Sequence, residues 1–421
     1  MKKYLKYIII IAAFLIYGCT QQTETSAENY AAADEVKYLR QIITDDASVS
    51  RTVMWQSDAE IKNPVAEFKS SDNKITAVPA SMQELNTGTS RIFVYTAELT
   101  GLNPDSTYEY RAGYENSRTD WHKLSTAAPQ NFKALIFPDS QSADYSGWHK
   151  LAQNAYAKNN DAAFFINMGD LVDNGYDLSQ WRAWFSAVTP MIENIPFAPV
   201  MGNHETYNME WKVAMPTPYL TLFSLPENGS SENRNHYYSF DYGDVHFTVL
   251  NTQNDELADF KPDLMQEQLA WLRSDLANTQ SKWKVVLMHK DILRYAFTDR
   301  PNIFDPASIQ FTPWAEELMP VFEEFNVDAV LTAHLHTYRR RVPLKNFRPD
   351  NSGITYILTG VAGSVRYANL WQQNPTDAAL APQPEDANYL SLEKTDDALT
   401  FKAFLPDGTQ FDAATITKER N

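Results

Sequence analysis

Five apolar segments of this 421-residue chain each end next to a side chain of the kind that binds metal ions. The segments are 132–138, 162–168, 197–201, 283–288 and 327–332, and the residues that follow them are Asp139, Asp170, Asn203, His289 and the pair His334 and His336. Short apolar runs that alternate with stretches of helical spacing predict a mostly parallel α/β sheet. Ligands of such sheets bind beyond the carboxyl ends of the strands. The pattern therefore predicts one shared site at a sheet edge.

The histidine pair supports this interpretation. In an extended segment, residues i and i+2 point the same way with Cα atoms about 7 Å apart, so both imidazoles can face one small volume. Taken alone, His334 and His336 could also be a polar strand end that meets water. The four other strand ends favour a metal site. Carboxylate, amide and imidazole ligands together suit divalent Zn, Mn, Fe or Co, and a carboxylate can bridge two ions about 3.5–4 Å apart.

The rest of the pattern divides the chain into a β-rich part and an α/β part. Residues 35–128 contain short strand candidates separated by turn residues, which is typical of a β-sandwich. Within them, Tyr108 follows a Leu and a Pro at the spacing of the fibronectin type III corner tyrosine, whose hydroxyl bonds back to the chain. Residues 131–421 alternate strands with helices, which we expect at 147–158, 178–192, 263–277 and 312–325.

The N-terminal residues are typical of an export signal. Three lysines precede the apolar run 8–17, which is too short for a transmembrane helix. The run ends beside Cys19, the single cysteine of the chain. Residues 1–18 therefore resemble a bacterial lipoprotein signal peptide, and residues 19–34 a tether; an ordinary signal peptide with an unrelated cysteine is the alternative. We expect a membrane anchor through lipidated Cys19 in the bacterial cell envelope, facing the periplasm or the exterior.

The formal charge of −17 argues against a nucleic acid as the main partner, since nucleic-acid binding needs a basic face. A small anionic substrate remains compatible with this charge, because bound metal ions make a site locally positive. The sequence does not define an oligomeric state.

Together, the five motifs resemble those of the calcineurin-like metallophosphoesterases, and within them the purple acid phosphatase branch. The motifs are FPDSQ with Asp139, NMGDLVDNG with Asp170, GNHE with Asn203 and His204, VLMH with His289, and AHLH with His334 and His336. The resemblance implies an α/β metallophosphoesterase sandwich, with central mixed β-sheets flanked by helices. A small all-β, fibronectin III-like sandwich precedes it, as in that branch.

The resemblance also implies a role for each motif residue. Asp139 and His336 would bind metal one, Asn203, His289 and His334 would bind metal two, and Asp170 would bridge the two divalent ions. His204 would face the phosphate oxygens and the leaving group. The implied reaction is hydrolysis of a small phosphate monoester by attack of metal-bound hydroxide. A phosphodiesterase with the same metal centre is the alternative, and an interaction lipoprotein with a degenerate enzyme domain is a third, less favoured one.

Three positions depart from the family pattern. Asp173 stands where purple acid phosphatases have the tyrosine that binds ferric iron, and Gln141 stands where other branches have a histidine. Ala333 replaces the glycine usual before the histidine pair. Gln141 is therefore a candidate additional ligand of metal one, through its neutral oxygen. The basic run 339–341, close after the pair, is interpreted as a solvated strand rather than as a phosphate site.

Overall fold

The computed structural model describes residues 23–25, 31–128, 130–294, 310–367 and 375–418. The proposed signal peptide and Cys19 lie outside these residues. Among the helices of the described ranges, none combines the length and the apolar character that a membrane span requires.

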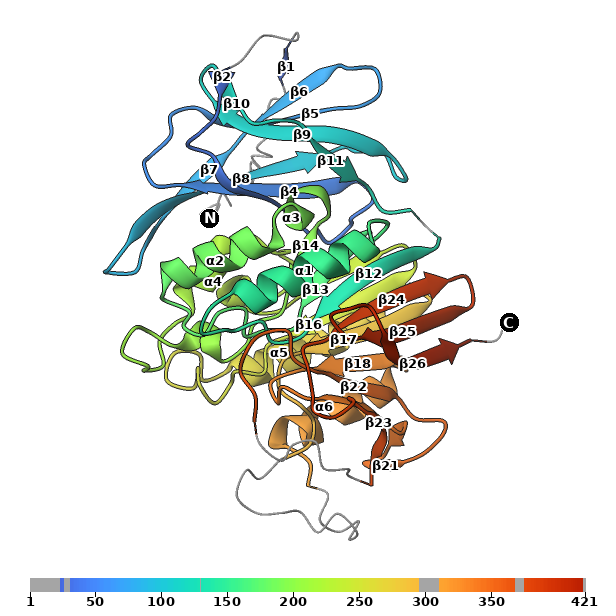
Figure 1. Cartoon of the computed structure of the whole chain (residues 1–421). Helices are drawn as coiled ribbons and strands as arrows, with labels where there is room; N and C mark the ends of the chain where they lie inside the picture. Colours follow the sequence, from blue (N-terminus) through green and yellow to red (C-terminus); the bar gives the residue numbers. More distant parts are fainter. Residues whose placement is uncertain (1–22, 26–30, 129, 295–309, 368–374, 419–421) are drawn as a thin grey trace, which may run out of the picture.

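The N-terminal part is an all-β domain built from two sheets (Figure 1). Its strands are β1 (Thr23–Thr25), β2 (Ala31–Ala32), β3 (Lys37–Ile42), β4 (Ser50–Ser57), β5 (Pro64–Lys69), β6 (Ile75–Pro79), β7 (Ser81–Asn86), β8 (Arg91–Thr100), β9 (Thr107–Tyr114), β10 (Ser117–Arg118) and β11 (His122–Ser125). One sheet has the order β1-β6-β5-β9-β10-β2, with β11 on β9. The predicted corner tyrosine is present, because the hydroxyl of Tyr108 accepts a hydrogen bond of 2.9 Å from the backbone N–H of Asn103.

The second N-terminal sheet continues into the α/β part of the chain. Strands β7, β8, β4 and β3 join β14, β13, β12, β24, β25 and β26 in one ten-stranded sheet. The junction is the parallel pairing of β3 with β14, where Ile42 lies opposite Phe197. A third sheet has the order β15-β16-β17-β18-β22-β19-β23. It packs on the α/β half of the ten-stranded sheet, and the two share one hydrophobic core.

The strands and helices of the α/β part alternate along the chain as the sequence predicts. The strands are β12 (Phe132–Phe137), β13 (Phe164–Asn167), β14 (Phe197–Pro199), β15 (Tyr238–Tyr242), β16 (Val245–Leu250), β17 (Trp283–Met288), β18 (Ala329–Thr332), β19 (Tyr338–Arg341), β20 (Leu344–Lys345), β21 (Arg348–Pro349), β22 (Thr355–Thr359), β23 (Asp377–Leu380), β24 (Tyr389–Thr395), β25 (Ala398–Phe404) and β26 (Gln410–Thr417). The helices are α1 (Ser146–Lys158), α2 (Leu178–Val188), α3 (Met191–Asn194), α4 (Thr217–Leu222), α5 (Leu264–Asn278) and α6 (Pro313–Glu324), with short 3-10 turns η1 (His204–Thr206) and η2 (Ser231–Asn233).

One expected helix is wrong in its extent. The pattern at 178–192 predicted a single helix, but the structure breaks it into α2 and α3 around Pro190. Proline has no N–H to donate and its ring clashes with the preceding turn, so a helix does not continue through it. The aromatic side chains of α2 lie in the core, since Trp181, Trp184 and Phe185 are all buried.

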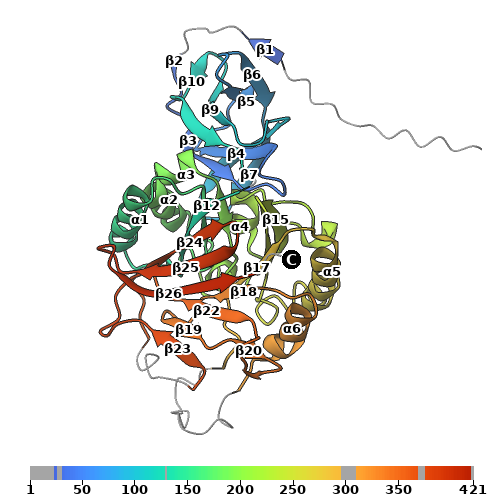
Figure 2. The same ribbon diagram turned by 90° about the vertical axis from the view of Figure 1, so that its right-hand side faces the viewer.

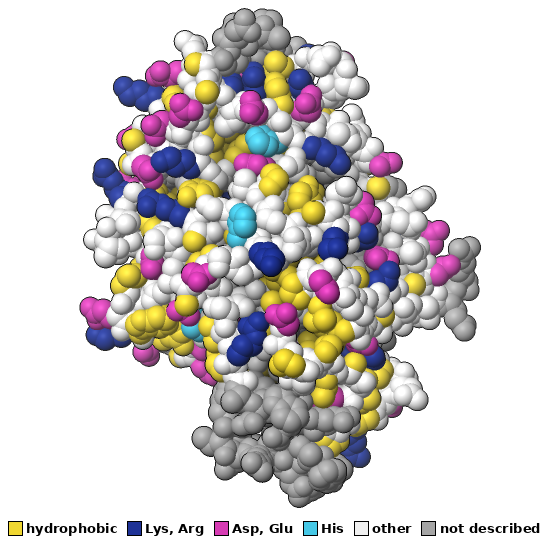
Figure 3. Space-filling model, viewed as in Figure 1, with side chains coloured by type: hydrophobic (Ala, Val, Ile, Leu, Met, Phe, Trp, Pro, Cys, Tyr) yellow, Lys and Arg dark blue, Asp and Glu magenta, His cyan; other side chains and the backbone are white. Residues whose placement is uncertain are grey.

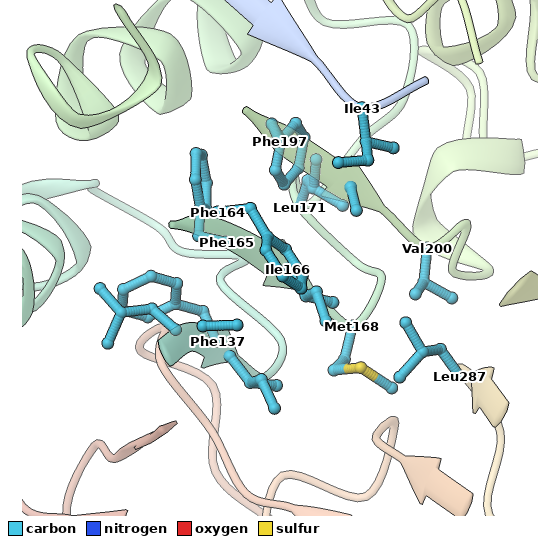
Figure 4. Close-up of a cluster of buried hydrophobic side chains, with 14 of the residues drawn as sticks. Ile43, Phe137, Phe164, Phe165, Ile166, Met168, Leu171, Phe197, Val200 and Leu287 are labelled. Atoms are coloured by element: carbon cyan, nitrogen blue, oxygen red, sulfur yellow. The ribbon is translucent and has the colours of Figure 1, made fainter. Parts of the chain in front are cut away.

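Four layers result, with α1 and α2 outside one sheet and α5 and α6 outside the other (Figures 1 and 2). The side chains of β17 pack into both neighbouring layers, because successive residues of a strand face opposite sides of the sheet. Val285 and Leu287 pack in the core between the sheets, whereas Val286 and Met288 pack against α5 and α6. Figure 4 shows the central cluster, in which Phe137, Met168 and Leu287 precede metal-ligand candidates by two residues. Apolar packing therefore fixes the strand ends that carry the site.

Candidate metal centre

The structure brings the predicted residues together at the carboxyl ends of five strands. Asp139 follows β12, Asp170 follows β13, Asn203 follows β14, His289 follows β17, and His334 and His336 follow β18. All are buried except His334, which is half-buried. Because β12, β13 and β14 pair in parallel, as do β17 and β18, their ends meet at one edge. The two sheets supply ligands from opposite sides.

These side chains form two clusters that share one carboxylate. Asp170, His289 and His334 make one cluster, and Asp139, Asp170 and His336 make the other; the candidate ligand atoms of each lie within 4.8 Å of one another. Nε2 of His289 is 3.0 Å from Oδ2 of Asp170, and Nε2 of His336 is 3.3 Å from Oδ1 of Asp139. A shared carboxylate between two imidazole sites is the arrangement that a pair of divalent ions requires.

The amide of Asn203 lies at the first cluster. Its Oδ1 is 3.2 Å from Nε2 of His289. Burial raises the pKa of the neighbouring Tyr207, and a hydrogen bond with the Asn203 side chain acts in the opposite direction. The Asn203 amide thus directs its oxygen toward His289 and its nitrogen toward Tyr207. This orientation suits a neutral oxygen ligand of metal two.

Two of the histidines have fixed tautomers. Nδ1 of His289 lies 2.9 Å from the backbone oxygen of Met168, and Nδ1 of His336 lies 2.9 Å from that of Val365. An N–H donated to a carbonyl leaves the Nε2 lone pair free for a metal. Nδ1 of His334 is buried without a hydrogen-bond partner among the described atoms, which is the state expected of a ligand atom.

The buried carboxylates and imidazoles of the centre favour the binding of cations. Burial alone would raise the pKa of Asp170, but nearby His289 and His204 outweigh burial and hold that pKa well below its usual range. Burial lowers the pKa of His289, yet Asp170 raises it to about 9 overall. Burial and the neighbouring His289 lower the pKa of His334 to about 3. The donor set therefore fits divalent cations, which balance buried carboxylates while leaving a neutral imidazole lone pair available.

Close backbone contacts explain the glycines beside the ligands. A Cβ at Gly202 would lie 2.1 Å from Oδ1 of Asp170, and a Cβ at Gly169 would lie 2.4 Å from Nδ1 of His289. Asp170 and His334 themselves have positive φ angles of 49° and 74°. Left-handed conformations are unfavourable for residues other than glycine and cluster at functional sites. The loops are thus shaped around the ligand side chains.

Glu205 is a positioning residue to which the sequence analysis gave no role. Its buried carboxylate accepts hydrogen bonds from the backbone N–H groups of Asp170 (3.0 Å), Leu171 (2.8 Å) and Gly202 (2.7 Å). Burial raises the pKa of Glu205 to about 7. The carboxylate ties the loop after β13 to the loop after β14. The sequence signal for this role was the position of Glu205 in the GNHE motif.

His204 lies at the edge of the centre, outside both clusters. Its backbone N–H donates to Oδ1 of Asp170 at 2.8 Å. Its Nδ1 is 2.7 Å from the backbone oxygen of Asp173 and 3.6 Å from that residue's Oδ1. Donation from Nδ1 leaves Nε2 for a substrate oxygen. Asp173, at the place of the family tyrosine, thus contacts His204 and belongs to neither cluster.

Gln141 and Tyr367 lie beside the second cluster. The Gln141 side chain is buried, with its amide nitrogen 3.5 Å from Nε2 of His336 and with Oε1 unpartnered among the described atoms. Rotation of the amide by half a turn would place Oε1 toward the cluster, where it is a neutral oxygen donor. The Tyr367 ring packs on His336 with ring centroids 4.7 Å apart. No sequence signal placed this tyrosine at the site. Tyr176, which follows Asp173 by three residues, does not replace the family tyrosine, since its hydroxyl donates a hydrogen bond to the backbone oxygen of Met215.

The basic run after the histidine pair is mostly buried, contrary to expectation, although Arg340 is partly exposed and pairs with Asp412. Arg339 and Arg341 are fully buried, and both pair with Asp377. Arg341 also pairs with Asp291 at 2.6 Å, two residues after His289. Guanidinium groups can be buried when several carboxylate oxygens surround them. Arg341 thus supports the loop after β17 from inside the fold.

Comparison with known proteins agrees with this geometry. Residues 119–338 match the calcineurin-like phosphoesterase family, and residues 38–126 match the purple acid phosphatase N-terminal domain. An uncharacterized protein of Mycobacterium tuberculosis is 26% identical over 393 residues, which is 80% of this chain and 70% of that protein. Purple acid phosphatase 23 of Arabidopsis thaliana is 28% identical over 303 residues, covering 63% and 62% of the two chains.

A solved structure shares the fold. Purple acid phosphatase PPD1 from yellow lupin (Lupinus luteus) seeds superposes with a TM-score of 0.77 at 17% identity, over 92% of this chain and 74% of the lupin chain. The family match covers more than half of the 421 residues. The chain belongs to the calcineurin-like phosphoesterase family and carries a purple acid phosphatase N-terminal domain before its catalytic part.

Proposed function

We propose that this chain is an exported, lipid-anchored hydrolase of small phosphate monoesters with a dinuclear centre of divalent ions. The observation that carries the proposal is the pair of buried clusters that share Asp170. In this arrangement Asp139 and His336 would hold one ion, Asn203, His289 and His334 would hold the other, and Asp170 would contribute to both. When bound, two such ions neutralise phosphoryl oxygens and lower the pKa of a water molecule.

The residues of the chain have separate tasks in the proposed reaction. Glu205 and the adjacent glycines hold Asp170 in place, so the bridging carboxylate does not need to reorganise. His204 is oriented by Asp173 and presents Nε2 toward the substrate side. A protonated His204 would donate a hydrogen bond or a proton to the leaving-group oxygen as the ester bond breaks.

A phosphodiesterase with the same centre is the rival proposal. The centre suits either ester, because both reactions need a nucleophile and charge neutralisation at phosphorus. A degenerate interaction protein is less well supported, since every principal ligand candidate lies in place. On the face in Figure 3, acidic and basic side chains are interspersed, which gives no support to a nucleic-acid partner.

The deciding experiment measures metal content and hydrolysis together. Purified protein should contain about two divalent ions per chain and hydrolyse a phosphomonoester faster than a matched diester. Asp170→Asn and His289→Ala should each lose bound metal and most activity, while the exposed Met82→Ala on β7 serves as a matched control. Full metal content and normal turnover in either site variant would refute the two-metal centre. Faster diester hydrolysis would favour the rival.

The anchor and export need their own test, because Cys19 lies outside the described residues. Cys19→Ser should leave the protein soluble after export, or leave an uncleaved precursor. Membrane partitioning and processing identical to the parent protein would refute the lipid anchor, without bearing on the metal centre.

A further inference from the structure

A short hairpin beside His204 presents apolar side chains to solvent. It runs from Tyr207 to Val213, which pair as an isolated bridge. The exposed large hydrophobic residues of the described ranges are Val49, Met82, Met209, Trp211, Val213, Phe260 and Tyr367. Four of these seven lie in this hairpin or on the ring of His336. Exposed apolar side chains that gather at one place indicate a binding surface.

The hairpin holds Trp211 in a fixed and unfavourable conformation. Trp211 has a φ of 58°, in the region that favours glycine or asparagine, and its side chain is 56% exposed. Its N–H donates to the backbone oxygen of Asn208 at 2.8 Å, and Oδ1 of Asn208 accepts hydrogen bonds from the N–H groups of Glu210 and Lys212. A bulky side chain kept in this conformation without burial points to a function for the ring.

The hairpin is also tied to the metal centre. Nδ2 of Asn174, in the loop after Asp170, donates to the backbone oxygen of Asn208 at 2.6 Å. The position of the indole is therefore set by the same loop that carries the bridging carboxylate. An aromatic ring that is already ordered loses little conformational entropy when a ligand stacks on it.

The rings are arranged around His204. The Trp211 ring centroid is 6.2 Å from that of His204, with the ring planes at 84°. Tyr207 is 5.4 Å from His204, with the planes at 89°. Both aromatic residues thus border the histidine that faces the leaving group in the proposed reaction. The exposed indole extends this border outward, where the alcohol part of an ester would lie.

We propose that Trp211 is a specificity residue that stacks on a planar aromatic group in the alcohol part of the phosphate ester. The inference rests on the proposed function, because it takes the phosphoryl group to lie at the metal centre. A nucleobase and a simple aryl ring share the required chemistry. Edge-to-face or offset contacts between aromatic rings are the interactions that such an exposed indole can add.

The test compares esters that differ only in the ring. Adenosine 5′-monophosphate and ribose 5-phosphate share the same reacting bond, and benzyl and propyl phosphate form a second pair that lacks a nucleobase. Trp211→Asn removes the ring but tolerates the left-handed backbone, and Trp211→Phe keeps a ring. We expect Trp211→Asn to lower kcat/KM roughly three- to tenfold for the ring-bearing ester of at least one pair. Its ring-free partner should be unaffected, and Trp211→Phe should retain most of the preference.

The outcomes separate this inference from the proposed function. An effect in the nucleotide pair alone identifies a nucleobase, and an effect in both pairs identifies any planar ring. Equal losses for both members of each pair, or no loss, would overturn the role of Trp211 while hydrolysis itself upholds the proposed function. Absence of hydrolysis of all four esters by metal-loaded protein would refute the proposed function, and this inference with it. Met82→Ala should alter no ratio.

Discussion

His246 is expected to stabilise the fold in a pH-dependent way. It lies on β16 with its side chain 7% exposed, between two carboxylates. Nδ1 is 2.8 Å from Oδ1 of Asp241 on β15, and Nε2 is 2.9 Å from Oδ2 of Asp275 on α5. A neutral imidazole has only one N–H, so both contacts can be hydrogen bonds only when the ring is protonated. Burial lowers the pKa of His246, but the two carboxylates outweigh burial and raise it to about 9.

The magnitude follows from the difference between folded and unfolded pKa values. The unfolded value is 6.5 and the folded value is about 9, and one pKa unit corresponds to about 1.4 kcal/mol. Protonated His246 therefore contributes about 3 kcal/mol to the free energy of unfolding. Because the folded pKa is raised, this contribution is complete below pH 6.5 and is lost as the pH rises through 9.

The assay compares urea unfolding of the parent protein and His246→Gln at pH 6, 7.5 and 9.5, followed by tryptophan fluorescence. Using the difference between the two proteins removes the effect of groups that titrate in both. The variant should be less stable by about 3 kcal/mol at pH 6, and the difference should shrink steadily toward pH 9.5. A difference that stays constant across this range would refute a protonated histidine between the two aspartates.

Further predictions concern the centre and its support. Gly202→Ala should displace the Asp170 carboxylate and abolish most activity with the fold retained, as checked by circular dichroism and metal analysis; normal metal content would contradict this. Metal one has neither the histidine nor the tyrosine that relatives place at positions 141 and 173, so chelators should remove it more easily than metal two. Gln141→His should make metal one about tenfold more resistant to chelators, and equal resistance of both ions in the parent would contradict the weaker site. Arg341→Met should cost about 3–5 kcal/mol of unfolding free energy, since it removes the ion pair of buried Asp291 and one of the two guanidinium partners of Asp377; an unchanged melting temperature would disprove that role. With Asp173 in the tyrosine position, purified protein should lack a ferric-tyrosinate absorption band, and a visible band abolished by reductant would refute this.

The ligand positions could be predicted because each depends on local pattern. An apolar run gives a strand, and the first polar residue after it lies at the sheet edge. Asp139, Asp170 and His289 all lie there in the structure. The order of motifs along the chain then identifies the family, because a specific set of ligands in a specific order carries more information than any one of them.

Features that depend on distant parts of the chain could not be predicted in this way. The counter-ion Asp377 lies 36 positions from Arg341, so the basic run resembled a solvated strand. The pairing of Ile42 with Phe197, which joins the two parts of the chain in one sheet, has no local signal either. The break of the helix at Pro190 is different, because it has a local signal. A proline in a helical pattern ends the helix, even where the apolar spacing continues on both sides.

The replacement of the family tyrosine changes more than the metal-one ligand set. Any residue at position 173 could offer its backbone oxygen to Nδ1 of His204, and Asp173 adds a carboxylate oxygen 3.6 Å from that nitrogen. Burial raises the pKa of Asp173, and the neighbouring His204 acts in the opposite direction. The Asp173 carboxylate therefore adds to the contacts that orient the His204 ring, which the proposed reaction places beside the leaving group. Loss of one ligand and support for the leaving-group histidine are two consequences of a single residue.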